Sequence, residues 1–122
     1  GKAVDTARYR VICANAIGGC QGTTGPSSPH PDDGRRWGSR FPRLTIEDMA
    51  LGHELLARHL EVGEIRAVVG GSMGGFQALA WTALAPTRIR RVYATATAAR
   101  HGAMQIGYNE VQRQAILRDP RW

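Results

Sequence analysis

The sequence has very little lysine and no long hydrophobic run. Lys2 is the only lysine, although the formal net charge is +6, so arginine supplies nearly all of the positive charge. No run of about 18 apolar residues occurs, and no basic segment followed by an apolar stretch opens the chain. The sequence therefore predicts neither a membrane span nor a signal peptide, and we expect a cytoplasmic protein without a membrane partner.

Cysteine and histidine are too few and too scattered for a metal site. Cys13 and Cys20 lie seven residues apart, with no second pair and no histidine at ligand spacing, which argues against a zinc site or a redox C-x-x-C motif. We expect free thiols, with Cys13 buried in an apolar strand. Among the histidines, His53 falls on an apolar helical face and should be packed, whereas His30 and His59 should be exposed.

The arginines are dispersed rather than clustered among aromatic residues, which argues against a nucleic-acid partner. The tightest group is Arg88, Arg90 and Arg91, which flanks the start of the predicted strand at 89–95. We interpret this group as a solvated strand end, and contact with a coenzyme phosphate is the alternative.

Apolar patterning predicts strands and helices that alternate along one domain, residues 1–122. A long segment rich in glycine and proline, 18–42, predicts a loop. Thr45 and Asp48 form a capping-box-like helix start, and Gly63 is expected to end that segment. Alternation predicts an α/β fold with a parallel sheet, flanking helices and right-handed crossovers. The expected strands are 10–15, 65–69 and 89–95, and the expected helices are 45–60, 76–85 and 104–118.

The most informative motif is the G-x-S-x-G run from Gly70 to Gly74, where an apolar strand meets a helix. Such a nucleophile elbow needs small residues two before and two after the serine, because the chain reverses sharply there. Ser72 is therefore the candidate nucleophile, and the backbone N–H of Met73 is a candidate oxyanion donor. A glycine-rich turn used only for packing is the competing interpretation. A phosphate-binding loop fits less well, since neither G-x-G-x-x-G nor a Gly-Lys-Ser/Thr ending is present.

A catalytic serine needs a histidine base and an orienting acid, which follow it in the order acid then histidine on this type of scaffold. His101 is the only histidine after Ser72, and no Asp or Glu lies between residues 76 and 100. The triad cannot be completed in the expected order. We therefore expect both groups on chain outside this sequence.

Three further segments are distinctive: GGCQGTTGPSSPHP at 18–31, GGSMGGFQALAW at 70–81 and NEVQRQAILRDPRW at 109–122. Together they resemble the homoserine O-acetyltransferase family of the α/β-hydrolase superfamily. The GTTGPSS stretch is more specific than the elbow, which lipases and esterases share. The segment FPRLTIEDM at 41–49 fits the family's helix start.

The resemblance implies ping-pong acyl transfer in methionine biosynthesis, from acetyl-CoA to the hydroxyl of L-homoserine. Ser72 is then the nucleophile and Met73 N–H an oxyanion donor, with acetyl-CoA as substrate and no permanently bound cofactor. The family's acid and histidine lie downstream of a helical lid, which residues 103–122 would begin. The chain thus resembles an internal fragment, a partial α/β-hydrolase core expected to be inactive alone. A homodimer is implied only by resemblance.

Several alternatives stay open at this point. Within the family, succinyl-CoA could replace acetyl-CoA, or serine could replace homoserine. A serine esterase uses the same triad but admits water, and a non-catalytic piece would associate only through open sheet edges.

Two further features each have two interpretations. The GTTGPSS loop either shapes a pocket mouth or uses Thr23, Thr24, Ser27 and Ser28 to satisfy its own turns. Arg113 either meets a substrate carboxylate or forms an intramolecular ion pair, which we favour.

Overall fold

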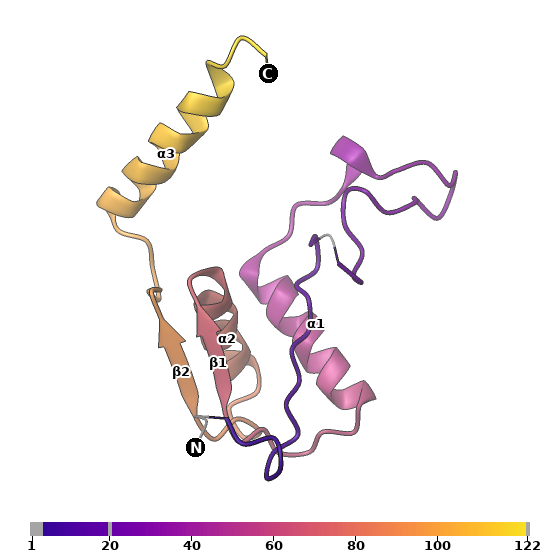
Figure 1. The fold of residues 1–122 in the computed structure, drawn as a ribbon, viewed down its shortest axis with the longest axis vertical. Helices are drawn as coiled ribbons and strands as arrows, with labels where there is room; N and C mark the ends of the chain where they lie inside the picture. The colour runs from indigo at the N-terminus through magenta and orange to yellow at the C-terminus, as the bar shows by residue number, and fades with distance from the viewer. Residues whose placement is uncertain (1–3, 20, 122) are drawn as a thin grey trace.

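Two parallel strands joined through a helix form a small sheet (Figure 1). The computed structural model describes residues 4–19 and 21–121. Strands β1 (Val68–Gly71) and β2 (Val92–Thr95) pair from Val68 with Val92 to Gly71 with Thr95. The α/β class and the parallel sheet are therefore confirmed. In chain order the elements are η1 (Gly38–Arg40), α1 (Ile46–His59), β1 (Val68–Gly71), α2 (Met73–Leu84), β2 (Val92–Thr95) and α3 (Ala103–Leu117).

Helix α2 packs on both strands, and α1 packs on α2 rather than on the strands. Small residues dominate the buried contacts, which lets the helices approach closely. Helix α3 makes no comparable contact with another described element and stands apart at the C-terminal end (Figure 1). No helix in the described ranges has the length and apolar character needed to cross a membrane. The buried hydrophobic side chains are Ala50, Ala57, Ala78, Ala85 and Ile89.

The capping box predicted at the start of α1 is confirmed. The Asp48 N–H donates to Thr45 Oγ1 at 3.1 Å, and the Thr45 N–H donates back to the Asp48 carboxylate at 2.8 Å. At the other end, Glu61 rather than Gly63 adopts the left-handed conformation, with φ 54°. The N–H groups of Glu61 and Val62 donate to carbonyls one turn back, in a Schellman motif. The helix therefore ends at His59, close to the expected end at residue 60, and the left-handed residue that follows it lies two residues before Gly63.

The expected strand at 10–15 is wrong. The segment is extended but joins no ladder in the described part of the chain, and Cys13 is exposed rather than buried. Cys20 lies outside the described residues. The expectation that 65–69 is buried on both faces is also wrong, since Val69 is 67% exposed. Burial on both faces requires layers on both sides of a sheet, and α2 covers only one side of β1.

A buried carboxylate, Glu54, joins the two packed helices and was not predicted. Glu54 lies on α1, is 3% exposed, and accepts hydrogen bonds from Trp81 Nε1 at 2.9 Å, Arg58 Nε at 2.7 Å and the Arg88 guanidinium. Burial alone would raise the pKa of Glu54. The hydrogen bonds from Trp81, Arg58 and Arg88 together outweigh it, so the pKa lies below its ordinary value.

The interpretation of Arg88 as part of a solvated strand end is wrong. Its side chain is only 20% exposed, and besides Glu54 it donates to the carbonyls of Val62 and Gly63. It thus closes the turn after α1 against the segment that leads into β2. Arg90 behaves as expected, because it pairs with Glu64 at the surface.

The turn from β1 into α2 brings two backbone segments into direct contact. A Cβ at Gly70 would lie 2.1 Å from the carbonyl oxygen of Gly74. At the adjacent Gly71, the nearest atom to a Cβ would be Thr95 Cγ2 at 3.6 Å, an ordinary contact. Only the first of these two glycines is required by space.

We predict that Glu54→Gln lowers the free energy of unfolding at pH 7 by about 3 kcal/mol, because it leaves Arg88 without its buried partner. The folded-state pKa of Glu54 is lowered, so its contribution is present above the unfolded-state value of about 4.3 and disappears as pH falls through the folded-state value. The gap between wild type and variant should therefore shrink in acid. Urea unfolding across this pH range measures it. The exposed Glu64→Gln is the control and should change little; an equal loss would contradict the burial argument.

We predict that Gly70→Ala disrupts the turn, because its methyl group would overlap the Gly74 carbonyl. Such overpacking costs on the order of 1–3 kcal/mol or more. Gly71→Ala, one residue along the same strand, should be tolerated. Thermal unfolding of both variants is the measurement, and equal melting temperatures would refute the steric argument.

Candidate active site

Ser72 lies in a strained turn between β1 and α2. Its φ of 52° and ψ of −119° fall in a region that non-glycine residues rarely adopt. Strain of this kind costs on the order of 1–3 kcal/mol and persists only when neighbouring contacts impose it. Here the Ser72 N–H donates to the Thr95 carbonyl at 2.9 Å, and the Ser72 carbonyl accepts from Gly75 and Phe76. This is the geometry that a nucleophile elbow requires, and the nucleophile role of Ser72 stays a prediction.

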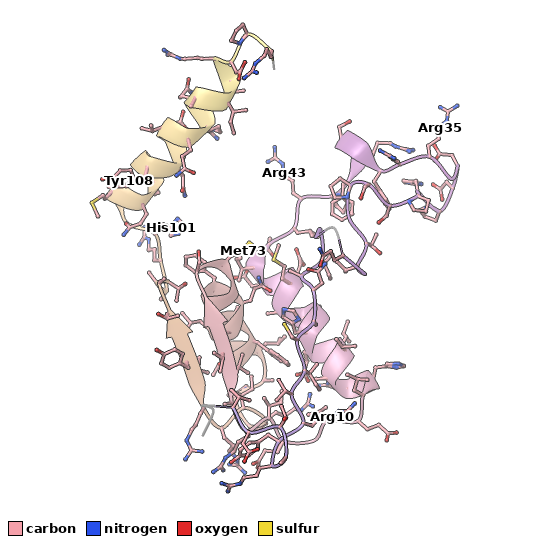
Figure 2. All side chains as sticks on the ribbon, viewed as in Figure 1. Arg10, Arg35, Arg43, Met73, His101 and Tyr108 are labelled. Atoms are coloured by element: carbon pink, nitrogen blue, oxygen red, sulfur yellow. The ribbon has the colours of Figure 1, made fainter. Side chains whose placement is uncertain are left out.

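Met73 opens α2 directly after the serine (Figure 2). The first N–H groups of a helix have no intrahelical acceptor and carry partial positive charge. The Ser72 side chain caps none of them, so they are not occupied by that hydroxyl. The Met73 side chain lines an open, mostly apolar depression of about 390 Å³ with Pro26, Phe41, Leu44 and other residues. The oxyanion role of its N–H is likewise still a prediction.

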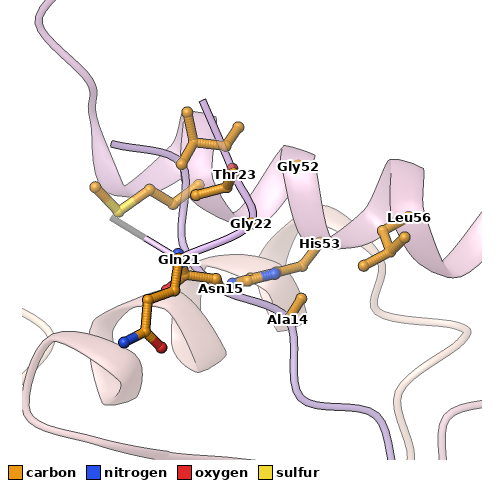
Figure 3. Close-up of a pocket in the computed structure, with 10 residues that line it drawn as sticks. Ala14, Asn15, Gln21, Gly22, Thr23, Gly52, His53 and Leu56 are labelled. Atoms are coloured by element: carbon orange, nitrogen blue, oxygen red, sulfur yellow. The ribbon is translucent and has the colours of Figure 1, made fainter. Parts of the chain in front are cut away.

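The GTTGPSS loop lines two depressions. Its Pro26 lies in the depression beside Met73 that is described above. Thr23 lines a second depression, of about 400 Å³, together with Asn15, His53 and Leu56 (Figure 3). Within the loop, Ser28 Oγ accepts a hydrogen bond from the Gly25 N–H at 3.0 Å. Both interpretations of the loop therefore have a structural counterpart: it lines depressions, and one of its serines satisfies its own turn.

His101 does not complete a triad in the described residues. It lies between β2 and α3 (Figure 2), is exposed, and packs its ring against Phe76 with centroids 5.0 Å apart. No described carboxylate forms a salt bridge or hydrogen bond with it, in line with the gap in acids between residues 76 and 100. The described chain also groups no three potential metal ligands.

The remaining candidates are resolved by their contacts. His53 is packed as predicted, with Nε2 2.8 Å from Gln77 Oε1. The expectation that His30 is exposed is wrong, because its ring lies 4.1 Å from that of Trp37 and its side chain is mostly covered. His59 is exposed as predicted. The intramolecular interpretation of Arg113 is confirmed, since it pairs with Glu110 on the same helix.

Sequence patterns missed two residues beside the elbow. Ala96 follows β2 with φ 49°, a second strained non-glycine residue next to the carbonyl that holds Ser72. Thr97 packs against Gly75, and its buried Oγ1 has no hydrogen-bond partner in the described residues. An alanine and a threonine after a strand carry no distinctive sequence signal, so only the structure could reveal them.

The whole chain, residues 1–122, matches the family model described as alpha/beta hydrolase fold. It is 51% identical over 122 residues to a homoserine O-acetyltransferase of Solidesulfovibrio magneticus, covering 100% of this chain and 31% of that protein. It is 50% identical to the homoserine O-acetyltransferase of Corynebacterium diphtheriae, covering 100% of this chain and 33% of that protein. The chain thus spans about a third of the length of these curated relatives.

Two solved structures extend this similarity to the fold. The crystal structure of esterase E22 superimposes with a TM-score of 0.86 at 32% identity, covering 100% of this chain and 35% of the esterase. The crystal structure of the homoserine O-acetyltransferase of Bacillus anthracis gives a TM-score of 0.64 at 29% identity, covering 67% of this chain and 22% of that protein. The resemblance inferred from the sequence motifs is confirmed. The chain belongs to the alpha/beta hydrolase fold family, and its similarity to homoserine O-acetyltransferases extends over its whole length.

Proposed function

We propose that this chain supplies the nucleophile elbow of an acyltransferase that moves an acetyl group from acetyl-CoA to L-homoserine. The observation that carries the proposal is the strained Ser72 turn, set in a sequence about half identical to proteins named homoserine O-acetyltransferases. Acetyl-CoA is then a substrate, and no permanently bound cofactor is required.

The proposed reaction has two half-reactions. Ser72 Oγ attacks the thioester carbonyl of acetyl-CoA, the C–S bond breaks, and CoA leaves with the proton that the serine lost. The homoserine hydroxyl then attacks the acetyl-serine ester, and the C–O bond to Ser72 breaks to regenerate the serine. Met73 N–H donates to the negatively charged oxygen of each tetrahedral intermediate, where the N-terminus of α2 also favours negative charge.

The reaction needs a histidine base and an acid that orients it. The 122 residues offer no such pair in the expected order, so we assign both groups to chain beyond this sequence. We also assign residues 103–122, which include α3, to the start of the lid. The isolation of α3 from the other elements supports that assignment, because a helix without internal partners must pack elsewhere.

A serine esterase is the second candidate, and the superposition on esterase E22 favours it. The two candidates share the acyl-serine and differ only in the acceptor, water or homoserine. We prefer the transferase because identity to homoserine O-acetyltransferases reaches 51%, against 32% for the esterase. The choice between acetyl and succinyl donors, and between homoserine and serine acceptors, depends on pocket residues outside this chain. A homodimer remains an expectation by resemblance.

In the protein as its gene encodes it, CoA release from acetyl-CoA should depend on homoserine and yield O-acetylhomoserine. Ser72→Ala should abolish both turnover and the acetyl mass shift of the protein, because the nucleophilic oxygen is removed. Mass spectrometry and a thiol-reactive dye measure these quantities. Ser39→Ala, at an exposed serine of η1, is the control and should leave them unchanged. CoA release at the same rate without homoserine would favour the esterase.

The isolated 122-residue chain should show no turnover, because it lacks the acid and histidine in the required order. The same coupled assay tests this at high protein concentration. Appreciable homoserine-dependent turnover by this chain, abolished by Ser72→Ala, would contradict the assignment of the base to another segment.

A further inference from the structure

Two polar contacts join α1 to α2 at different distances from the elbow. His53 Nε2 lies 2.8 Å from Gln77 Oε1, beside the first turn of α2. One turn further from the elbow, Trp81 Nε1 donates to Glu54 at 2.9 Å. Gln77 is only 6% exposed, and burial of an amide is tolerated when its groups are paired. The partners of the Gln77 amide can therefore be used to assign which of its two polar atoms faces which helix.

The hydrogen-bond partners fix the orientation of the Gln77 amide. Its Nε2 lies 3.4 Å from the Met73 carbonyl, which can only accept, so the amide nitrogen faces Met73. The amide oxygen consequently faces His53, and His53 Nε2 must carry a proton to donate to it. Figure 3 shows the His53 side chain projecting from α1. A directed chain thus runs from His53 through Gln77 to the carbonyl of Met73.

The first turn of α2 needs this support because its own sequence gives it little. Gly74 and Gly75 follow Met73 directly, and glycine is the least favourable residue in a helix interior apart from proline. The N-cap Ser72 makes no side-chain cap. On one side Thr97 packs against Gly75. On the other side the Gln77 amide connects the Met73 carbonyl to His53 of α1.

We propose that Gln77, held by His53, is a positioning residue for the elbow. It restrains the backbone of Met73 so that the Met73 N–H stays directed at the developing oxyanion. The inference rests on the proposed acyl-serine chemistry. Gln77 touches no reacting atom and acts only through Met73. Preorganised donors cost no reorganisation during reaction, and displacement by about 1 Å can cost up to two orders of magnitude in rate.

The test separates positioning from simple helix–helix adhesion. Gln77→Met keeps the length and helix propensity of the side chain but removes both hydrogen bonds. Trp81→Phe is the matched control, because it removes one hydrogen bond between the same two helices away from the elbow. Both variants should lose thermal stability. Only Gln77→Met should slow acylation, by about tenfold in kcat with little change in KM.

Acylation is followed in the protein as its gene encodes it, with p-nitrophenyl acetate and with acetyl-CoA. Gln77→Glu keeps an acceptor for His53 but loses the donor to Met73, so it should be as slow as Gln77→Met. His53→Leu should also slow acylation, His53→Gln should restore part of the rate by supplying an amide donor, and the double variant Gln77→Met/His53→Leu should lose nothing further. These variants keep the test decisive even if Trp81→Phe fails to fold.

Unchanged acylation in Gln77→Met, or equal slowing in Trp81→Phe, would overturn the positioning role. Acylation of the wild type by p-nitrophenyl acetate without transfer to homoserine would instead overturn the proposed acceptor and leave the role of Gln77 standing. Absence of any acylation of the wild type would overturn both.

Discussion

The close approach of β1 to the start of α2 is the constraint on which the rest of this structure depends. Gly70 lies so near the Gly74 carbonyl that no side chain fits between them, and the absence of a side chain at Gly70 permits the sharp reversal in which Ser72 has a positive φ. The strain is held by backbone bonds from Ser72 to β2 and to the first turn of α2. The position of Ser72 is therefore set by the junction between β1 and α2.

Helix α2 holds this geometry because two side-chain hydrogen bonds connect it to α1. The Glu54 carboxylate gathers Trp81, Arg58 and Arg88, so one buried charge connects both helices with the segment entering β2. Nearer the elbow, Gln77 links His53 to Met73. The buried apolar residues are mostly alanines, which provide close packing but little directional specificity. The polar contacts supply the directions that the small core does not.

Local signals in the sequence predicted the elements with strong patterns. The Thr45–Asp48 capping box, the apolar face of α1 and the G-x-S-x-G turn depend on residues within one or two turns of each other, so spacing suffices to find them. Burial at 10–15 and at Val69 could not be predicted in this way. An apolar pattern indicates that a segment can be buried, but whether it is buried depends on which other layers pack beside it.

The sequence by itself determined the elbow, the alternation of helix and strand, and the family, because these reside in short motifs and in identity along the chain. Only the tertiary structure decided that Glu54 and Arg88 form a buried pair, that His53 contacts Gln77, and that Thr97 packs against Gly75 beside the elbow. These contacts join residues from separate elements, Glu54 and Arg88 being 34 apart in sequence. Spacing along one element cannot encode a contact that exists only after two elements pack.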